Sequence, residues 1–275
     1  MPVKLIAIDL DGTLLSSNHI TIPFKNRLAL KRAIRQGIHV VPATGRTLFD
    51  IPKFLREFPG IKYMITSNGA DVWDIEAGVP IFSSPVPLDT AIEVLAAACE
   101  SSVYTEIYSG GKAYIQKGLK SEKFEKSPMF KLFRLLPKRM ETEDLADYIS
   151  HNPASVEKIE LLAESQTAGE EVLKKLKNLP LTITTSGMNS VEITNFDTSK
   201  AKGLNLLCGL LGIKANEVMA IGDNMNDLDM LVWSGISVAV ENADEELKKN
   251  ADFVTLSNDK CGVAFAIKKY IKQKN

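Results

Sequence analysis

The first third of the chain alternates short apolar runs with amphipathic segments. Apolar runs rich in β-branched residues occupy positions 3–8, 38–44 and 61–66, and each has the length of a strand buried on both faces. Between these runs, apolar residues recur at helical spacing over 24–36 and 51–58. The order strand, helix, strand, helix, strand is typical of a parallel sheet with helices packed against it.

The pattern changes near residue 84, where prolines mark a linker. From there to residue 189, the sequence predicts helices mixed with antiparallel strands. The expected elements are a helix over 90–100, a hairpin around Ser109-Gly110-Gly111, a weakly helical stretch over 120–149, a strand over 156–163, a helix over 168–177 and two strands flanking Gly187-Met188. We interpret this block as a smaller α+β domain inserted into the first domain.

The last third returns to the alternation of the first. The sequence predicts helices over 200–211, 228–233, 244–250 and 263–271, and strands over 218–223, 236–240 and 252–255. The predicted fold class is therefore α/β, with a Rossmann-like parallel-sheet core and an inserted α+β domain. We assign residues 1–84 and 190–275 to the core and residues 85–189 to the insert.

Composition excludes several classes of protein. The chain has 275 residues, of which 45% are hydrophobic and 24% charged, and its formal net charge is −1. It lacks the basic excess that nucleic-acid or anionic membrane binding requires. No apolar run is long enough to span a bilayer, and the N-terminus has no signal-peptide pattern. The three cysteines match no metal or redox spacing, so we expect a cytoplasmic protein that binds neither nucleic acid nor membranes.

An acidic motif follows the first apolar run. Asp9 and Asp11 come directly after the predicted strand, and Gly12 follows them. Carboxylates placed this close repel each other unless a cation lies between them or one is protonated. The carboxyl end of a buried parallel strand is also where open α/β sheets bind ligands. Because turns and helix caps use the same residue types, this stretch alone leaves a structural and a functional interpretation open.

A second acidic motif repeats this layout late in the chain. Asp223 ends the apolar run VMAIGD, and Asn226 and Asp227 follow in the next turn. Two distant strands therefore bring aspartates to one edge of the sheet. The three histidines are scattered and suggest no histidine-based site, and oxygen ligands alone favour Mg²⁺, which leaves room for water and phosphate. A calcium-binding EF-hand is excluded, because both motifs lack the glycine and the final acid of its loop.

In order and spacing, these motifs resemble the haloacid-dehalogenase-like (HAD) superfamily. The matching segments are DLDGTL at 9–14, Thr44-Gly45-Arg46 after the second strand, a lysine ahead of a helix near 200, and GDNMND at 222–227. The insert between the second and third motifs, with the Gly-Asp-x-x-Asn-Asp pattern, resembles the Cof-type subfamily with a C2 cap (subclass IIB). The resemblance implies that the inserted domain is a cap over the active site.

The resemblance also implies a role for each matching residue. Asp9 would be the nucleophile that forms an aspartyl-phosphate, and Asp11 would be the general acid and base. Mg²⁺ would be held by the side chains of Asp9 and Asp223 and by the backbone carbonyl of Asp11. Phosphate would be bound by the amides of Leu10 and Gly45, the hydroxyl of Thr44, the ammonium group of Lys200 and the side chain of Asn226. Asp227 would orient the lysine or a metal-bound water, and Thr13 would hold its own loop together.

Two lysines compete for the third motif, because Lys200 and Lys202 both lie at the start of the predicted helix. In the family, the lysine stands four residues before a core-facing leucine, and Leu204 meets this condition for Lys200. Helical phase would turn Lys202 away, so we choose Lys200. Arg46 and Asn68 are candidate substrate-binding residues, for which a surface salt bridge and a turn-forming asparagine are the alternative interpretations.

The predicted function is that of a Mg²⁺-dependent phosphatase acting on a small phosphorylated metabolite, usually a sugar phosphate in this subfamily. The alternatives are a sugar-phosphate phosphomutase and a non-catalytic protein that binds phosphorylated metabolites. Dehalogenase chemistry is disfavoured, because it does not need Asp11. Candidate substrate contacts in the cap, for each of which an ordinary sheet position is the favoured interpretation, are Tyr104, Glu106, Tyr108, Asn189 and Glu192. The sequence indicates neither the physiological substrate nor the oligomeric state.

Overall fold

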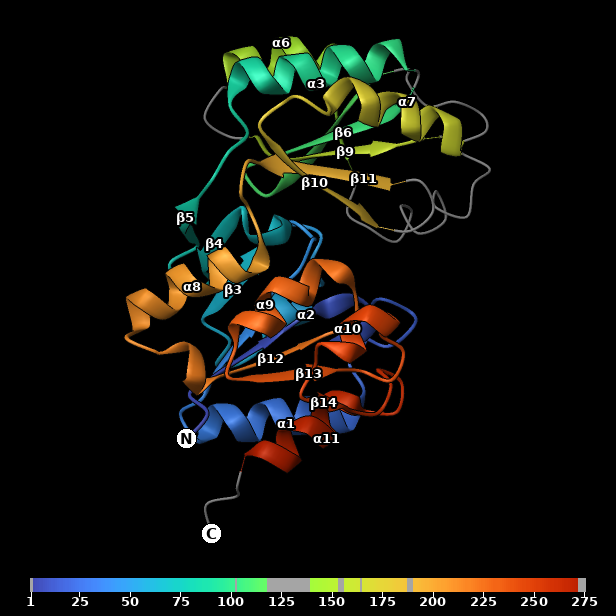
Figure 1. Ribbon diagram of the computed structural model, residues 1–275. Helices are drawn as coiled ribbons and strands as arrows, with labels where there is room; N and C mark the ends of the chain where they lie inside the picture. The colour runs from blue at the N-terminus through green and yellow to red at the C-terminus, as the bar shows by residue number, and fades with distance from the viewer. Residues whose placement is uncertain are drawn as a thin grey trace. The chain divides into compact units, whose positions relative to one another are not determined.

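The computed structural model describes residues 2–101, 103–117, 139–152, 156–163, 165–186 and 190–271. They form two compact units (Figure 1). The first unit, the core, comprises Met1–Arg46, Ile51–Phe82 and Ser199–Asn275. The second unit, the cap, comprises Thr47–Asp50 and Ser83–Thr198. Within the described ranges, no helix combines the length and the apolar character needed to cross a membrane.

A five-stranded parallel sheet forms the centre of the core. Its strands, in spatial order, are β14 (Phe253–Val254), β13 (Ile236–Ala239), β12 (Val218–Gly222), β1 (Leu5–Ile8) and β2 (His39–Pro42). Every neighbouring pair is parallel, and β1 lies between β12 and β2. All residues of β1 and β12 are buried, because both strands are apolar on both faces. This sheet confirms the predicted α/β core.

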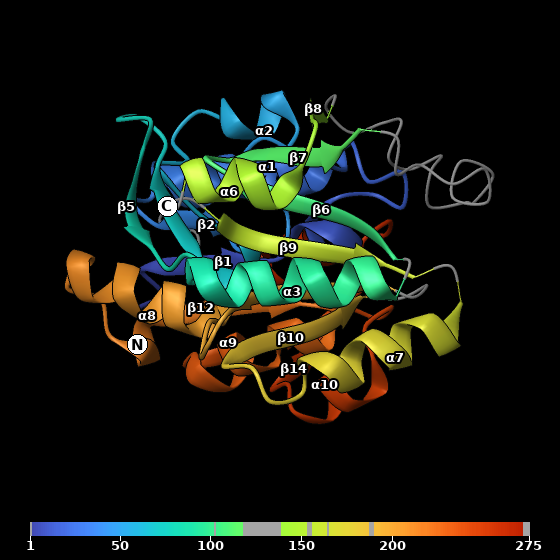
Figure 2. The same ribbon diagram turned by 90° about the horizontal axis from the view of Figure 1, so that it is seen from above.

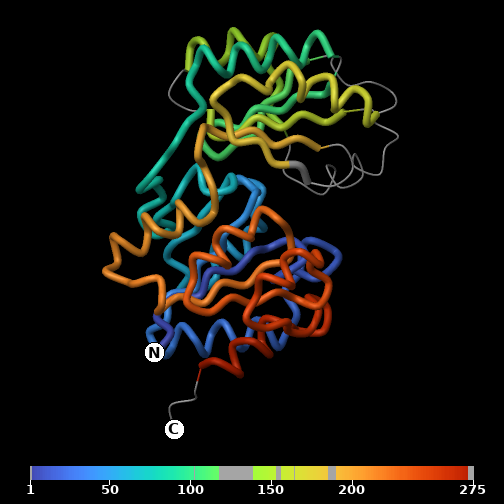
Figure 3. Tube along the Cα trace, in the orientation of Figure 1, coloured from blue at the N-terminus to red at the C-terminus, as the bar shows by residue number. Residues whose placement is uncertain are grey.

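Helices cover both faces of the core sheet (Figure 1). On one face lie α1 (Phe24–Arg35) and α11 (Gly262–Tyr270), and on the other lie α8 (Lys200–Leu211), α9 (Leu228–Trp233) and α10 (Glu245–Lys249). The tube in Figure 3 shows the red α11 running beside the blue α1. The two ends of the core sequence therefore pack against each other.

A smaller sheet extends the core beyond β2. It contains β3 (Tyr63–Thr66), β4 (Asp71–Asp74) and β5 (Val79–Ser83), and Ala43 after β2 pairs in parallel with Ile65 of β3. The sequence analysis predicted β3 but neither β4 nor β5, because both are short and β5 is largely exposed. The helix expected over 51–58 is limited to α2 (Lys53–Arg56).

The cap is an α+β unit, as predicted. Its sheet contains, in spatial order, β10 (Leu181–Ser186), β11 (Ser190–Asn195), β9 (Val156–Leu162), β6 (Tyr104–Ser109), β7 (Lys112–Gln116) and β8 (Met140–Thr142). The expected hairpin around residues 109–111 is the antiparallel pair β6–β7. Helices α3 (Leu88–Glu100), α6 (Leu145–His151) and α7 (Gln166–Leu176) cover one face of this sheet (Figure 2).

The boundaries between the units differ from the prediction. The sequence analysis assigned residues from 190 onward to the core, but β11 pairs with both β10 and β9 in the cap sheet. The long cap segment therefore begins at Ser83 rather than at residue 85, and the chain returns to the core at Ser199. The short segment Thr47–Asp50, which no sequence pattern marked, also belongs to the cap.

Two expectations fall partly outside the described residues. A weakly helical stretch was expected over 120–149, and its described part begins at residue 139. There the chain forms the strand β8 and then the helix α6, so a strand stands where helix was expected. The turn expected at Gly187-Met188 lies outside the described residues.

Gly69 allows the first turn of α8 to approach the turn that follows β3. Its φ is +99°, a backbone conformation that side chains other than glycine's rarely adopt. A Cβ atom at this position would collide with the carbonyl oxygen of Ser199, the N-cap residue of α8. The position of the α8 N-terminus, and hence of Lys200, therefore depends on the lack of a Cβ atom at Gly69.

We predict that Gly69→Ala lowers the stability of the core more than the matched variant Gly78→Ala. Both glycines have positive φ, so each substitution costs about 1 kcal/mol of backbone strain, whereas no atom lies within 4 Å of the Cβ position at Gly78. The collision with Ser199 should cost about 1–3 kcal/mol more at Gly69. Denaturant unfolding of both variants measures the difference, and equal losses would contradict the proposed role of Gly69.

Candidate active site

The carboxyl ends of β1 and β12 bring the two acidic motifs together. Asp9 directly follows β1, and its backbone N–H donates to the carbonyl oxygen of Ile221 in β12 at 3.0 Å. Asp223 directly follows β12. Carboxylate oxygens of Asp9, Asp223 and Asp227 lie within 4.8 Å of one another. Residues more than 200 positions apart therefore form one acidic cluster at the edge of the parallel sheet.

A tight turn over Leu10–Leu14 connects the cluster to the rest of the core. Gly12 adopts a φ of +79°, and a Cβ atom here would collide with the carboxylate of Asp223. The Thr13 hydroxyl donates to Asp223 Oδ1 at 2.5 Å. The expectation that Thr13 holds its own loop together was therefore incomplete, because its side chain joins the first acidic motif to the second.

Lys200 lies at the N-terminus of α8 and is fully buried. Its Nζ is 2.6 Å from Asp9 Oδ1 and 2.6 Å from Asp227 Oδ1. Burial alone would lower the pKa of Lys200, but the charges of Asp227 and Asp9 raise it above its usual value, so the side chain remains an ammonium ion. Lys202 is exposed, so Lys200 is the lysine that the structure places against the acidic cluster.

Both carboxylate oxygens of Asp227 accept hydrogen bonds within the cluster. Its Oδ1 accepts from Lys200, and its Oδ2 accepts the backbone N–H groups of Asp223 at 2.9 Å and Asn224 at 3.1 Å. Both oxygens are thus already engaged with donors. This arrangement orients Lys200 and the turn after β12, and it leaves Asp9 and Asp223 as the side chains better suited to hold a metal ion.

The electrostatics of the cluster fit a divalent cation. Burial raises the pKa of Asp9 even though Lys200 opposes the shift. Burial and the charge of Asp227 raise the pKa of Asp223 to about 7. At Asp9 and Asp223, the nearby ammonium group therefore does not offset the effect of burial on the carboxylate. Closely spaced carboxylate oxygens with this excess of negative charge match the donor chemistry of Mg²⁺.

Asp11 does not join the cluster; an arginine and a histidine hold it instead. Arg46 donates from Nε and Nη2 to the two oxygens of Asp11 at 2.7 Å and 2.6 Å, and His19 Nδ1 lies 2.9 Å from Oδ1. Burial would raise the pKa of Asp11, but the hydrogen bonds from His19 and Arg46 lower it to about 2. In return, the Asp11 carboxylate raises the pKa of His19. Asp11 is therefore held as a carboxylate in this arrangement.

Two sequence expectations change at this contact. Arg46 was a candidate for substrate binding or for a surface salt bridge, but its guanidinium pairs with Asp11 inside the site. The histidines suggested no histidine-based metal site or triad, and that interpretation did not anticipate the contact of His19 with Asp11. His19 also accepts a hydrogen bond from Arg46 Nη2 through its carbonyl oxygen at 3.0 Å. His19 has a φ of +60° and lies in an irregular loop, where no periodic pattern indicates its position.

The candidate phosphate-binding residues lie in turns at the same edge of the sheet. Thr44 follows β2, and its Oγ1 accepts the backbone N–H of Arg46 at 3.1 Å. Its carbonyl oxygen accepts the N–H of Asn68, and Asn226 Nδ2 donates to Asn68 Oδ1 at 3.1 Å. Asn68 is thus a left-handed turn residue, with a φ of +55°, that also contacts the second acidic motif. Leu10 and Gly45 occupy the turns directly after β1 and β2.

The cap residues proposed as substrate contacts belong to a buried polar network. Tyr108 Oη lies 2.8 Å from both Glu106 Oε2 and Glu160 Oε2, and Lys158 Nζ is 3.0 Å from Glu192 Oε1. Tyr104 Oη donates to Glu106 at 3.1 Å. These contacts favour the structural interpretation of Tyr104, Glu106, Tyr108 and Glu192. Asn189 lies outside the described residues.

Known proteins are similar to this chain in sequence and in fold. The model of the haloacid dehalogenase-like hydrolase family matches residues 6–267. Phosphatase YwpJ of Bacillus subtilis is 31% identical over 97% of this chain and 99% of its own length. The 5-amino-6-(5-phospho-D-ribitylamino)uracil phosphatase YcsE of the same organism is 29% identical over 98% of this chain and 96% of its own length. The solved structure of the HAD subclass IIB sugar phosphatase BT4131 covers 98% of this chain and 99% of its own, with 27% identity and a TM-score of 0.83.

The fold and the acidic cluster thus define a hydrolase with its candidate site at the carboxyl ends of a parallel sheet. The chain belongs to the haloacid dehalogenase-like hydrolase family. The resemblance inferred from four short motifs is confirmed, and it extends over nearly the whole chain.

We predict that Arg139→Met destabilises the cap. Arg139 is buried, and its guanidinium contacts Asp50 Oδ1 at 2.9 Å and Glu106 Oε2 at 3.1 Å. Removing it leaves two buried carboxylates without this cation, which should cost about 3 kcal/mol. The matched variant Lys117→Met breaks the exposed ion pair with Glu143 and should cause no measurable change. Denaturant unfolding followed by circular dichroism tests both, and an equally small effect of Arg139→Met would refute the prediction.

We also predict that Lys200→Met destabilises the core in a pH-dependent way. Without the ammonium group, the buried carboxylates of Asp9 and Asp227 lose their cation, which should cost about 3 kcal/mol at pH 7. The pKa of Asp9 is already raised, and the variant raises it further, so folding takes up protons. The deficit should therefore be smaller at pH 5 than at pH 7.

Lys202→Met is the matched control, because it removes an exposed lysine from the same turn. It should match the wild type at both pH values. If Lys202→Met produced the pH-dependent loss and Lys200→Met did not, the choice between the two lysines would be reversed.

Proposed function

We propose that this chain is a Mg²⁺-dependent phosphatase that hydrolyses small phosphomonoesters, with sugar phosphates as the first class to test. The observation that carries this proposal is the buried Asp9 carboxylate, which Lys200 Nζ contacts at 2.6 Å beside Asp223. A carboxylate fixed in this way at the end of a strand is suited to attack phosphorus, since a covalent intermediate divides hydrolysis into two easier steps.

In the first step, Asp9 attacks the phosphorus atom, and the bond between phosphorus and the ester oxygen breaks. The products are an aspartyl-phosphate and an alcohol, whose oxygen takes a proton from Asp11. The phosphoryl oxygens would be bound by donors at the sheet edge: the backbone amides of Leu10 and Gly45, the Thr44 hydroxyl, the Lys200 ammonium group and the Asn226 side-chain amide. These groups supply positive charge or hydrogen bonds where negative charge develops.

In the second step, water attacks phosphorus and releases Asp9, and Asp11 accepts the proton from that water. The hydrogen bonds from His19 and Arg46 keep Asp11 ionised and therefore able to accept a proton, but the resulting low pKa makes it a weak base. Donating a proton in the first step requires a higher pKa. A phosphate group bound by Arg46 would draw its guanidinium away from Asp11 and raise that pKa, because arginine pairs with phosphate and with carboxylate in the same bidentate way.

Mg²⁺ would be held by the side chains of Asp9 and Asp223 and by the carbonyl oxygen of Asp11. When bound, it supplies positive charge that offsets the repulsion between the Asp9 carboxylate and the phosphate. Asp227 would keep its hydrogen bonds to Lys200 and to the turn after β12, and it would act as a positioning residue.

The relatives support a phosphorylated sugar or polyol as substrate. BT4131 is described as a sugar phosphatase, and YcsE is named for a phosphorylated ribitylamino compound. Both names specify a phosphate carried by a small polyhydroxylated molecule. We therefore infer the same class for this chain, with the cap (residues 85–189 by sequence, Ser83–Thr198 by contacts) as the domain that selects the leaving group.

The two alternatives have distinct assay outcomes. A phosphomutase would transfer the phosphoryl group to a second sugar position and would need a bisphosphate, whereas a phosphatase releases inorganic phosphate in proportion to substrate consumed. A binding protein without activity would retain a phosphorylated ligand without turnover. A panel of sugar and polyol phosphates, assayed both for released phosphate and for isomerised sugar phosphate, with and without a hexose bisphosphate, distinguishes all three outcomes.

We predict that Asp9→Asn abolishes hydrolysis of p-nitrophenyl phosphate and leaves the unfolding transition close to that of the wild type. The amide has the shape of the carboxylate but cannot form the aspartyl-phosphate. Because the pKa of Asp9 is raised by burial, the neutral side chain should be tolerated. The matched variant Asp229→Asn, which changes an exposed acid near the second motif, should keep wild-type turnover.

Metal removal gives an independent test of the same site. Chelation with EDTA should abolish turnover, and added Mg²⁺ should restore it. Asp223→Asn should raise the Mg²⁺ concentration needed for half-maximal rate, because it removes one charged ligand. Wild-type rates in EDTA, or with Asp9→Asn, would overturn the proposed mechanism.

A further inference from the structure

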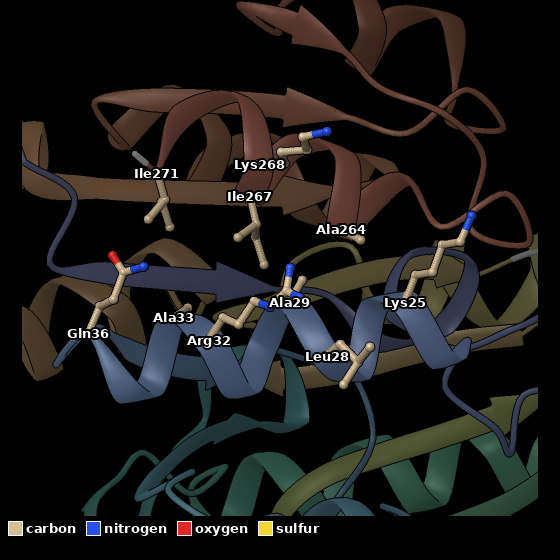
Figure 4. A pocket seen from close by; sticks show the side chains of 10 residues that line it. All are labelled: Lys25, Leu28, Ala29, Arg32, Ala33, Gln36, Ala264, Ile267, Lys268 and Ile271. Atoms are coloured by element: carbon tan, nitrogen blue, oxygen red, sulfur yellow. The ribbon is translucent and has the colours of Figure 1, made fainter. Parts of the chain in front are cut away.

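The two helices on the far side of the core sheet enclose a cavity that no part of the proposed mechanism uses. It has a volume of about 300 Å³ and lies between α1 and α11 (Figure 4). The buried Asn26 fixes the spacing of these helices, since its Oδ1 accepts the backbone N–H of Ala264 at 2.9 Å. The cavity is therefore bounded by two packed helices, and its size is at the lower end of the range for small-molecule sites.

The floor of the cavity is aliphatic. It is lined by six apolar side chains from the two helices: Leu28, Ala29, Ala33, Ala264, Ile267 and Ile271. Leu28 is 37% exposed at the mouth, while the deeper Ala33 is 1% exposed. No aromatic ring lines the cavity, so it suits an aliphatic chain better than a flat ring system.

The rim of the cavity is cationic. Lys25 and Arg32 from α1 and Lys268 from α11 are exposed and line the opening (Figure 4). Within the described part of the chain, these three side chains form no ion pair or hydrogen bond. Three cations beside an aliphatic floor are complementary to a molecule with an apolar chain and an anionic head.

The charge of the two helices is also unusual for this chain. Phe24–Arg35 carries five basic residues and no acidic one, and Gly262–Tyr270 carries two basic residues and no acidic one. The whole chain has 33 basic and 34 acidic residues, so this face is strongly biased. Helix dipoles favour cations in the last turn, which explains Arg32 and Lys268, but they disfavour Lys25 in the first turn of α1. A ligand for Lys25 would explain its position.

We infer that the cavity between α1 and α11 binds a free single-chain amphipathic anion, with its aliphatic chain on the floor and its carboxylate or phosphate head between Lys25, Arg32 and Lys268. None of the ten lining residues belongs to the candidate active site. The inference is therefore independent of the phosphatase proposal and is tested without measuring catalysis.

Isothermal titration calorimetry with decanoate, kept below its micelle concentration, tests the inference on the full chain. Decanoate should bind saturably with one site per chain, whereas decanol and acetate, which each lack one half of the amphiphile, should bind at least about tenfold more weakly. The inference is overturned if the wild-type chain does not bind decanoate saturably, or if it binds acetate as tightly as decanoate.

Matched variants locate the site. Arg32→Glu should weaken decanoate binding at least about tenfold, because it replaces a rim cation by a negative charge that repels the decanoate carboxylate. Arg35→Glu makes the same charge change on the same helix outside the lining and should have no such effect. Leu28→Gln should weaken binding, and Leu210→Gln, at another exposed leucine on α8, should not. Equal effects within either pair would show non-specific binding and would overturn the inference.

Two further measurements separate the inferred ligand from other occupants. The protein could co-sediment with phosphatidylglycerol vesicles in a way that depends on Arg32 and yet not bind free decanoate. This result would assign the face to a membrane and overturn the inference. Binding of an acidic amphipathic peptide, without binding of free decanoate, would assign it to a protein partner with the same consequence. Unchanged unfolding transitions of all four variants show that differences in binding do not reflect misfolding.

Discussion

The buried ion cluster around Lys200 is the constraint on which the core depends. One ammonium group lies 2.6 Å from each of two buried carboxylates, and a third carboxylate, Asp223, lies beside them. A buried charge without a partner costs several kcal/mol, so the ends of β1 and β12 and the start of α8 must meet at Lys200 Nζ. Three carboxylates and one ammonium group leave two uncompensated negative charges when all are ionised. A site of this charge would repel phosphate unless a cation were bound, and this repulsion supports the divalent metal that we propose.

Close packing of the backbone makes this convergence feasible. Gly12 lies against the Asp223 carboxylate, and Gly69 lies against the carbonyl oxygen of Ser199, where α8 begins. Each removes a side chain where two segments from opposite ends of the sequence come together. Asp227 then fixes the turn after β12 through two backbone N–H groups. The geometry of the site therefore depends on close approaches at glycines and on side-chain-to-backbone hydrogen bonds, as well as on the ion pairs of Lys200.

Elements with a strong periodic pattern were predictable from the sequence, and those without one were not. The apolar runs of β1 and β12, the helix over Lys200–Leu211 and the β6–β7 hairpin were predicted because each pattern is local. The boundary of the cap was misplaced at residue 190, where β11 begins. The pairing of β11 with β10 and with β9, about thirty residues earlier, assigns this strand to the cap sheet. Strand pairing of this kind is a tertiary property, and hydrophobic alternation does not encode the partner.

The same distinction applies within the candidate site. Asp9 and Asp223 were identified because each follows a predicted strand, whose end has a defined place on the sheet. Lys200 was identified from the family resemblance and from the helical phase of the segment that it begins. His19 was missed because its loop is positioned by contacts from the other end of the chain: Ser17 Oγ donates to Asp259 at 2.5 Å, and Asn258 donates to the Leu15 carbonyl oxygen at 3.0 Å. These contacts span more than 240 residues. The environment of Asp11, and therefore its low pKa, depends on a tertiary arrangement that neither the motif nor its spacing determines.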